Sequence, residues 1–390
     1  MANGNTMKAW TVRKERYGSP ADAMKIEEVA IPEIGDNDIL VKNLAAGVNY
    51  NGIWVASGYP KDVVEVQKLY GNNVDFIIPG SESAGIVVKV GKNVTRFQEG
   101  DEVICYSAQY DENEEMDDPR IGSSFRVWGY ENNWGAFAEY SKVQQQQCFR
   151  KPAYLSWEEA GCTVAAGSTV YSMLTHWSEN RIKKDDIVLI WGGAGAVGIS
   201  AVILVKLLGG IPVTIVSHED KMKLCMEYGA AGCIDRRSYA ALEPLTADML
   251  RNNAEYDRWL YNAMKIRRDI WKAAGIRRDP AIVIEHPGES TLPLSLFLCA
   301  KKGMVVTCGA TTGYTGTFDL RHLWMHLKRI QGSHVCCGYE VEEYLKLMEN
   351  NDKKIPIDRV YDFNDAAQAH MDLMDGKAAT GRFVVRIADK

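Results

Sequence analysis

The 390 residues of this chain exceed the roughly 100–200 residues of a typical domain, so two domains are expected. Hydrophobic residues make up 46% of the chain and charged residues 25%, which is ordinary for a globular protein, and a formal net charge of -6 argues against nucleic acid as a main partner. The sequence shows neither an apolar leader nor a run of ~18 apolar residues, so we expect a cytoplasmic protein that does not cross a membrane.

Between about residue 7 and residue 150 the chain carries short β-branched runs separated by glycine, among them DILVKNLAAG and AGIVVKVG, which predict a small β-rich, barrel-like unit. From about residue 158 strands alternate with helices, as in DIVLIW followed by GISAVILVKLLGG, which predicts a doubly wound parallel α/β sheet. Residues 238–276 are polar and helix-favouring and interrupt the strand rhythm, so we interpret them as a helical insertion. The predicted domains are 1–157 with 343–390, and 158–342.

Nine cysteines, an odd number at irregular spacing and partly inside apolar runs, predict reduced and mostly buried thiols rather than a disulfide framework. Cys336 and Cys337 are adjacent in the chain. We favour ordinary packing over redox chemistry for this pair, because vicinal cysteines rarely reach good disulfide geometry.

The segment DIVLIWGGAGAVGISAVILVK predicts a dinucleotide site. A hydrophobic strand runs directly into Gly193, Gly195 and Gly198, and an apolar helix with Ala196 and Val197 in its first turn follows. Glycines at this spacing allow a tight turn and a close backbone approach, and amides at the helix N-terminus can bind a pyrophosphate. The glycine pattern alone is weak evidence, but the flanking strand and helix favour dinucleotide binding over a turn without a ligand.

The cofactor is predicted to be NADPH rather than NADH. An NAD-selective site places an acidic side chain at the end of the second strand, about 20 residues further on, where this chain has VTIVSHEDK. Ser217 stands at that position and Lys221 follows one helical turn later, so a 2′-phosphate would meet a donor and a cation. Glu219 lies between them and is expected to point to solvent.

A β-rich GroES-like unit followed by a Rossmann unit resembles the medium-chain alcohol dehydrogenases, but their zinc ligands are not in this sequence. Those enzymes hold catalytic zinc through a cysteine and through a histidine in a GHE segment, whereas this chain has Asn49 in GVNYNG and Ser81 in PGSESAG. Neither side chain is a competent zinc ligand there, so we expect no metal. Without a Lewis acid, reduction of an activated C=C bond is favoured over reduction of a ketone.

Several longer segments occur together, in the order AAGVNYNGIW, IPGSESAG, VWGYENNWGAFAEY, LSWEEAGCTVAAGSTVY, VIEHPGEST and LRHLWMHLKRIQGSH. They resemble the crotonyl-CoA carboxylase/reductases over nearly the whole chain, and they are far more specific than the glycine turn. The resemblance implies hydride transfer from NADPH to Cβ of a short α,β-unsaturated acyl-CoA, such as crotonyl-CoA or acryloyl-CoA. The enolate would then attack CO2 at Cα and give a 2-substituted malonyl-CoA, such as ethylmalonyl-CoA or methylmalonyl-CoA.

The resemblance also implies the residues of a CO2 pocket: Asn51 of the VNYN segment, Tyr130 and Glu131 of the WGYE segment, and His334 of the GSH segment. CO2 is linear and uncharged, so an amide N–H and an imidazole would orient its oxygens and stabilise the carboxylate that develops. The glutamate would fix the tautomer of the histidine and help to order water. The alternatives are structural roles, with the asparagine as a turn cap, the glutamate as a loop partner and the histidine as a core residue.

Further site residues follow from the resemblance. Candidates for binding coenzyme A are Arg321, Lys328 and Arg329, with a solvated basic face as the alternative. Candidates for the nicotinamide end of the cofactor are Thr163 and Thr169, and Cys308 is a further cofactor-binding candidate. Oligomerisation through the Rossmann sheet is expected, as a homodimer or a homotetramer.

One tyrosine leaves the outcome of the reaction open. Tyr59 lies in SGYP, and non-carboxylating enoyl-thioester reductases have a tyrosine in a similar segment that protonates Cα. If Tyr59 reaches the enolate, protonation competes with CO2 and the enzyme is mainly a reductase. Reductive carboxylation is the favoured hypothesis and simple enoyl-CoA reduction the second, while quinone reduction and a non-catalytic nucleotide-binding or structural protein are remote alternatives.

Overall fold

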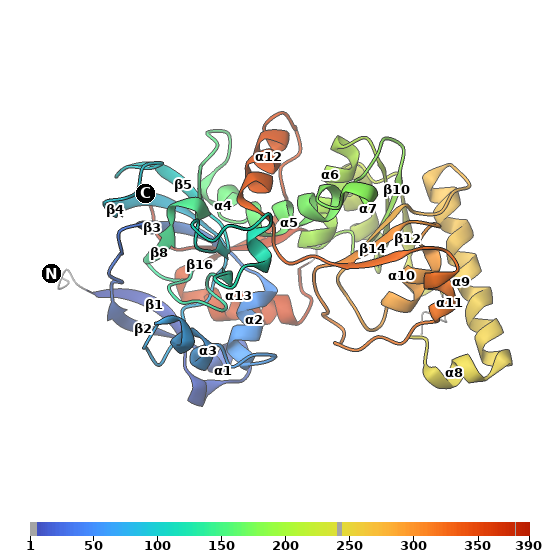
Figure 1. Ribbon diagram of the computed structural model, residues 1–390, viewed down its shortest axis with the longest axis horizontal. Helices are drawn as coiled ribbons and strands as arrows, with labels where there is room; N and C mark the ends of the chain where they lie inside the picture. Colours follow the sequence, from blue (N-terminus) through green and yellow to red (C-terminus); the bar gives the residue numbers. More distant parts are fainter. Residues whose placement is uncertain (1–5, 240–243, 379) are drawn as a thin grey trace. The chain divides into compact units, whose positions relative to one another are not determined.

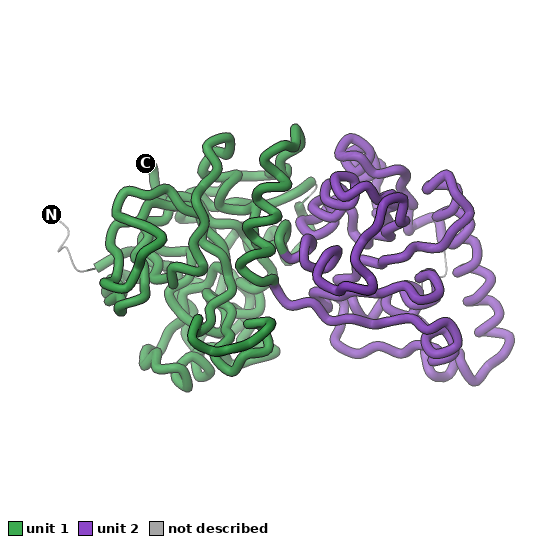
Figure 2. Tube along the Cα trace, turned by 45° about the horizontal axis from the view of Figure 1, so that its top comes forward, with its two compact units in different colours: residues 1–168, 336–390 green, residues 169–335 purple. Residues whose placement is uncertain are grey.

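The computed structural model describes residues 6–239, 244–378 and 380–390. The chain forms two compact units, Met1–Ser168 with Cys336–Lys390 (unit 1) and Thr169–Val335 (unit 2), which Figure 2 colours separately. The chain passes from unit 1 to unit 2 between Ser168 and Thr169, inside helix α5 (Val164–Thr175), so this boundary does not lie in a loop. The boundary predicted from the sequence is 157/158. Among the described residues, none of the helices combines the length and the apolar character that a membrane crossing requires.

Unit 1 is built on a seven-stranded sheet in which the neighbours run β16-β17-β3-β4-β5-β9, with β8 paired to β3. At its centre β3 (Asp38–Gly47) pairs antiparallel with β4 (Ser83–Val90), β8 (Tyr140–Gln144) and β17 (Arg382–Arg386). The other strands are β5 (Glu102–Cys105), β9 (Cys148–Arg150) and β16 (Ile357–Asp362). Two small sheets join β1 (Thr6–Val12) to β2 (Met24–Ala30) and β6 (Ala108–Gln109) to β7 (Arg126–Val127). The predicted β-rich unit is therefore confirmed.

Short helices fill the connections of unit 1. Helix α2 (Tyr50–Ser57) packs closely on α13 (Ala366–Met374), because a Cβ at Gly52 would lie only 2.2 Å from Nε2 of His370. The C-cap of α2 is Gly58, whose left-handed φ of 64° suits glycine. The other α-helices are α1 (Pro20–Ala23), α3 (Val63–Val66), α4 (Trp157–Ala160) and α12 (Gly338–Glu349). The 3-10 helices are Lys14–Arg16, Gln67–Tyr70, Pro119–Ile121, Gln145–Gln147 and Phe363–Asp365 in unit 1, and Ser178–Asn180 and Arg236–Ser238 in unit 2.

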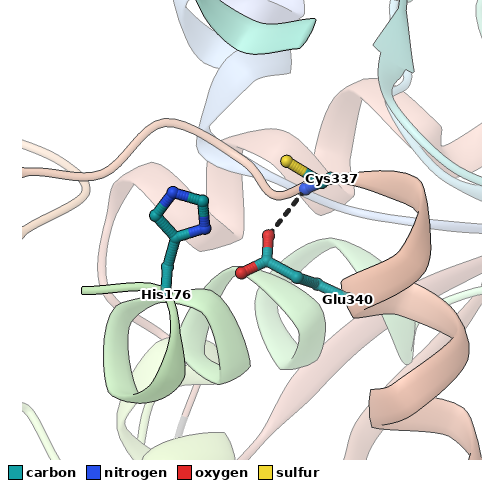
Figure 3. A group of neighbouring side chains, drawn as sticks. All are labelled: His176, Cys337 and Glu340. Carbon is teal, nitrogen blue, oxygen red and sulfur yellow. Dashed lines mark hydrogen bonds between the residues drawn. The ribbon is translucent and has the colours of Figure 1, made fainter. Parts of the chain in front are cut away.

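Helix α12 begins directly after the adjacent cysteines. The backbone N–H of Cys337 donates to the Glu340 carboxylate at 2.7 Å, half of a reciprocal cap at the first turn (Figure 3). Cys336 is buried, and burial raises the pKa of its thiol to about 12. All nine cysteines are free thiols and only Cys233 and Cys308 are less than fully buried, which confirms the expectation of reduced and mostly buried cysteines.

Unit 2 is a six-stranded parallel sheet in the order β12-β11-β10-β13-β14-β15. Its strands are β10 (Ile187–Trp191), β11 (Ile211–Val216), β12 (Gly232–Asp235), β13 (Ile282–Glu285), β14 (Met304–Thr307) and β15 (Arg329–Gly332). The order reverses between β10 and β13, as in a doubly wound dinucleotide-binding sheet, so the predicted Rossmann fold is confirmed.

Helices cover both faces of this sheet (Figure 1). Alternate side chains of β10, namely Ile187, Leu189 and Trp191, join one buried cluster with α9 (Asn253–Ala274) and α10 (Leu292–Leu298). Helices α6 (Ala196–Leu207) and α7 (Glu219–Glu227) contact β10, β11 and β12 on the other side. The last helix of unit 2, α11 (Leu320–Trp324), precedes β15.

The segment interpreted as a helical insertion supplies a covering helix of the sheet. Helix α8 (Ala247–Arg251) leads into α9, which Asn252 caps at the start and which ends at Gly275 in the left-handed conformation. The buried residues of α9 follow helical spacing and pack against the sheet: Trp259, Ala263, Ile266 and Ile270. The connection from β12 to β13 is thus a long crossover, of which residues 240–243 lie outside the described residues.

Candidate active site

The glycine turn after β10 has the geometry of a pyrophosphate cradle. The N–H of Gly195 donates to the carbonyl of Gly192 at 2.9 Å, and Gly195 is the N-cap of α6. A Cβ at Gly193 would lie 2.6 Å from the Thr214 side chain, and a Cβ at Gly198 would lie 2.2 Å from the Gly192 oxygen. These two glycines are needed for packing, whereas the exposed Gly195, followed by the half-buried Ala196 and Val197, leaves the first amides of α6 open to an anion.

The residues predicted to select the 2′-phosphate follow β11. Ser217 is half-buried directly after the strand, and Lys221 lies in the first turn of α7. Glu219 is 78% exposed and pairs with Lys223 at 3.2 Å, so the expectation that it points to solvent is confirmed. Its carboxylate is therefore satisfied by its own helix.

Sequence reasoning missed a basic residue at this end of the sheet. Arg237 follows β12, and one of its guanidinium nitrogens lies 3.3 Å from Nδ1 of His218, the residue after Ser217. Asp235 orients the same guanidinium through hydrogen bonds as short as 2.7 Å. The signal available in the sequence was the pair of arginines directly after a predicted strand, in GCIDRRS.

The EHPG segment supports the glycine turn from the neighbouring strand. Nε2 of His286 lies 3.0 Å from the Trp191 carbonyl at the end of β10, and burial lowers the pKa of this imidazole. Glu285 is buried, accepts hydrogen bonds from Thr291 at 2.7 Å and Ser295 at 2.5 Å, and has a pKa that burial raises. These side chains hold the end of β13 beside the turn. In the sequence, the EHPG segment served only as one of the segments that resemble the family, and no role was predicted for Glu285 or His286.

The remaining cofactor-binding candidates lie in different environments. The Thr163 hydroxyl is 2.8 Å from the hydroxyl of Tyr344 in unit 1, so it has a structural partner. Thr169 is buried in the part of α5 that belongs to unit 2. Cys308 follows β14, and burial raises the pKa of its thiol to about 12, which makes it a packing group rather than a nucleophile.

The three coenzyme A candidates differ in how open they are. Arg321 is 59% exposed, held by Asp319 at 2.7 Å, with its guanidinium 5.3 Å from the centroid of the Tyr256 ring. Lys328 donates to the carbonyls of Leu296 at 2.7 Å and Phe297 at 3.2 Å at the end of α10, and burial lowers its pKa. Arg329 begins β15 and pairs with Glu179 at 3.4 Å. Arg321 therefore presents the most open cation, with an aromatic ring beside it.

Unit 1 brings three of the predicted CO2-pocket residues together. Asn51, in the first turn of α2, donates from Nδ2 to the Ser81 hydroxyl at 3.1 Å. Ser81 follows Gly80, and a Cβ at Gly129 would lie 1.9 Å from the Gly80 oxygen, so the WGYE loop rests on this segment. The VNYN, PGSES and WGYE segments thus meet at one place.

Tyr130 and Glu131 are fixed by that loop. Both are buried, and the N–H of Glu131 donates to the Val127 carbonyl at 2.7 Å. The Tyr130 ring packs against Trp54 of α2 with 6.2 Å between centroids, and Glu131 forms an ion pair with Lys61. Sequence reasoning missed Lys61. Tyr59, two residues earlier, is 60% exposed.

His334, the fourth predicted residue, belongs to unit 2. It is exposed in the segment after β15, between Ser333, whose N–H donates to the Thr307 carbonyl at 2.7 Å, and Val335, which has a positive φ of 52°. A left-handed β-branched residue is strained, so neighbouring structure must hold this turn. Strain of this kind is common next to functional side chains.

Comparison with known proteins places the chain in a family. The family model described as "Alcohol dehydrogenase GroES-like domain" matches residues 35–153, and the one described as "Zinc-binding dehydrogenase" matches residues 196–350. The crotonyl-CoA carboxylase/reductase of Cereibacter sphaeroides is 37% identical over 98% of this chain and 87% of that protein. The chain belongs to the crotonyl-CoA carboxylase/reductase family. The resemblance drawn from the sequence is confirmed.

Solved structures of the family agree with this assignment. The crotonyl-CoA carboxylase/reductase AntE in complex with NADP is 41% identical, with a TM-score of 0.93 over 98% of this chain and 95% of that one. The 2-octenoyl-CoA carboxylase reductase CinF in complex with NADP and 2-octenoyl-CoA is 32% identical, with a TM-score of 0.89 over 99% of this chain and 89% of that one.

The name of the second family model implies zinc, but the residues of this family member do not fit the metal. Asn49 donates to Glu82 at 2.8 Å and accepts from Arg382 at 3.0 Å, and the Ser81 hydroxyl accepts from Asn51. An amide and a hydroxyl replace the thiolate and imidazole ligands of a catalytic zinc, and Glu82 is paired with Arg382.

Proposed function

We propose that the chain catalyses the NADPH-dependent reductive carboxylation of a short α,β-unsaturated acyl-CoA, such as crotonyl-CoA or acryloyl-CoA. NADPH, when bound, supplies the hydride that adds at Cβ. The electron pair of the resulting enolate then forms the Cα–carbon bond to CO2, and a CO2 oxygen takes the negative charge as a carboxylate. The observation that carries this proposal is the meeting of Asn51, Tyr130 and Glu131 in unit 1.

The cofactor half of the proposal rests on unit 2. The amides at the start of α6 would bind the pyrophosphate, and Ser217 and Lys221 would bind the 2′-phosphate, with Arg237 as a further cation. Solved relatives bound to NADP support this cofactor. Thr163 and Thr169 would lie toward the nicotinamide, with Cys308 as a further cofactor contact. Arg321, Lys328 and Arg329 would lie toward coenzyme A.

The pocket residues can orient CO2 without a metal. Asn51 uses one amide hydrogen for Ser81 and retains a second for a CO2 oxygen. The buried Tyr130 ring offers an apolar wall that limits water, which would otherwise protonate the enolate. Glu131 would help to stabilise the carboxylate as it forms, and the family resemblance implies the same role for His334.

Simple enoyl-CoA reduction is the second candidate, and the exposed Tyr59 is the observation that favours it. If the Tyr59 phenol reaches the enolate, it would protonate Cα, and Cα could then no longer form a bond to CO2. The two candidates predict different products from one substrate.

The test follows crotonyl-CoA and acryloyl-CoA with NADPH, with and without bicarbonate and carbonic anhydrase, and identifies the acyl-CoA products by mass. A product with one added carboxyl group, formed only when bicarbonate is present, is expected. Saturated acyl-CoA alone would establish the reductase, and a Tyr59→Phe variant would then lose activity. Absence of NADPH oxidation with either substrate would refute both candidates.

We also propose a homodimer or homotetramer that forms through the Rossmann sheet. The strand β15 lies at the edge of the six-stranded sheet, so its outer backbone groups are open to pairing. Just before it, Leu320, Trp324, Met325 and Leu327 are 58–69% exposed, an apolar group that a second copy would cover. Nine free thiols support a reducing compartment, which favours the cytoplasm.

A further inference from the structure

Lys61 is the cation beside the predicted CO2 pocket. Its ammonium pairs with one carboxylate oxygen of Glu131, and the exposed fractions of the two side chains are 51% and 11%. The other oxygen of Glu131 accepts from the backbone N–H of Val127 at 3.1 Å. The carboxylate is therefore held from two sides, by its own loop and by the chain that follows α2.

The pair matters because Glu131 is buried. A carboxylate on a residue that is only 8% exposed as a whole depends on protein partners for its solvation. The Val127 amide alone would leave half of that carboxylate without a charged or hydrogen-bonded partner among the described residues. The Glu131 side chain would then turn toward water or toward another donor.

The same short stretch of chain also carries Asn51. Asn51 and Trp54 are three residues apart on α2, and Lys61 follows four residues after the helix ends at Ser57. Trp54 contacts the Tyr130 ring and Lys61 contacts Glu131. Residues 50–61 therefore contact both Tyr130 and Glu131, and the same segment contains Asn51.

We propose that Lys61 is a positioning residue for CO2 capture, which holds Glu131, and with it Tyr130, in place beside Asn51. The inference rests on the proposed function and adds to it a residue that acts through Glu131. We expect Lys61 to influence whether the enolate is carboxylated or protonated, and not the binding of NADPH. The glycine turn that would hold the cofactor lies in unit 2 and shares no helix or strand with Lys61. Loss of the ammonium favours protonation of the enolate over carboxylation.

The test compares Lys61→Met, which keeps most of the length of the side chain without its charge, with Lys61→Arg, which keeps the charge. Lys68→Met is the matched control, because Lys68 forms pairs of the same kind with Glu65 at 3.3 Å and Asp75 at 3.2 Å. Each protein is given crotonyl-CoA, NADPH, bicarbonate and carbonic anhydrase. The readouts are the ratio of carboxylated to saturated product, the KM for CO2 and the melting temperature.

Lys61→Met should lower the product ratio about tenfold and raise the KM for CO2, a modest effect because the lysine is half-exposed. The substitution should change the ratio of carboxylated to saturated product and leave the rate of NADPH oxidation nearly the same. Lys61→Arg should recover most of the ratio, and Lys68→Met should behave as the unsubstituted protein. In a Glu131→Gln background, Lys61→Met should add little, because both substitutions break the same contact.

Two results would overturn the assignment of Lys61. One is an unchanged product ratio in Lys61→Met while the unsubstituted protein carboxylates. The other is full additivity with Glu131→Gln, which would show that the lysine does not act through the glutamate. If the unsubstituted protein forms only saturated product, the proposed function fails, and the role of Lys61 fails with it.

Discussion

Replacing Arg382 with methionine should remove the charged partner of a buried carboxylate in the centre of unit 1. Arg382 and Glu82 form an ion pair in which the two side chains are 1% and 0% exposed. Glu82 also accepts from the Asn49 amide at 2.8 Å and from the Ala165 backbone N–H at 2.8 Å. Because the Glu82 side chain is buried from water, its charge is stabilised by these protein groups within the described part of the chain.

The magnitude follows from that environment. Removing one partner of a buried ion pair costs about 3–5 kcal/mol, because the remaining charge has no water to replace it. The two hydrogen bonds that Glu82 keeps place the expected loss near the lower value. At roughly 2–4 °C per kcal/mol for a unit of this size, about 3 kcal/mol lowers the melting temperature by about 6–12 °C.

The double substitution Glu82→Met with Arg382→Met should cost less than Arg382→Met alone. It removes both charges together with two buried guanidinium nitrogens of Arg382, Nε and Nη1, that have no hydrogen-bond partner in the described part of the chain. Replacing a whole buried ion pair with apolar groups is often close to neutral.

Calorimetry and circular dichroism on these variants provide the assay. The matched control is Arg386→Met on the same strand, whose side chain is 48% exposed and pairs with Glu158 at 2.9 Å, a pair worth at most about 1 kcal/mol. A melting temperature of Arg382→Met within 2 °C of the unsubstituted protein, or an equal loss in the control, would show that Glu82 does not depend on Arg382 for its stability in the core.

Three further predictions concern the rest of the molecule. Gly195→Ala should weaken NADPH binding in a fluorescence titration at an unchanged melting temperature, whereas Gly198→Ala should lower both, since its Cβ would lie 2.2 Å from a backbone oxygen. Equal thermal losses would contradict this difference. The hydrogen bond from Cys225 lowers the pKa of the Cys233 thiol to about 7. The thiol therefore loses its proton as the pH rises through about 7, and alkylation of Cys233 by iodoacetamide should increase over the same range. Peptide mass mapping measures this alkylation. A midpoint near 9 would count against that shift. Trp324→Glu should move the light-scattering mass toward the monomer, and an unchanged mass would exclude this face as the interface.

Local sequence patterns predicted the parts of the structure that are local in the chain. The strand, glycine turn and helix around Gly193 and Gly198 could be predicted because the steric requirement acts within a few residues. The Asn51, Tyr130 and Glu131 segments were found by resemblance, which selects the residues but gives no contacts between them. The crossover through α9 was interpreted as an insertion, because its polar face dominates the composition and its buried stripe is a minority of the residues.

Contacts between distant positions could not be predicted from patterns. Glu82 and Arg382 are 300 positions apart, and Lys61 and Glu131 are 70 positions apart. Their pairing depends on the order of strands in the sheet and on how loops pack, and neither leaves a periodic signal. The structural roles of Thr163 and Lys328 were missed for the same reason, because their partners lie on other elements.

The most direct test of reductive carboxylation is the ratio of carboxyl groups incorporated to NADPH oxidised, measured with ¹³C-labelled bicarbonate, carbonic anhydrase and crotonyl-CoA. Reductive carboxylation predicts a ratio close to one, with the label in the carboxyl group on Cα of a 2-substituted malonyl-CoA. NADPH oxidation that gives unlabelled saturated acyl-CoA would contradict it.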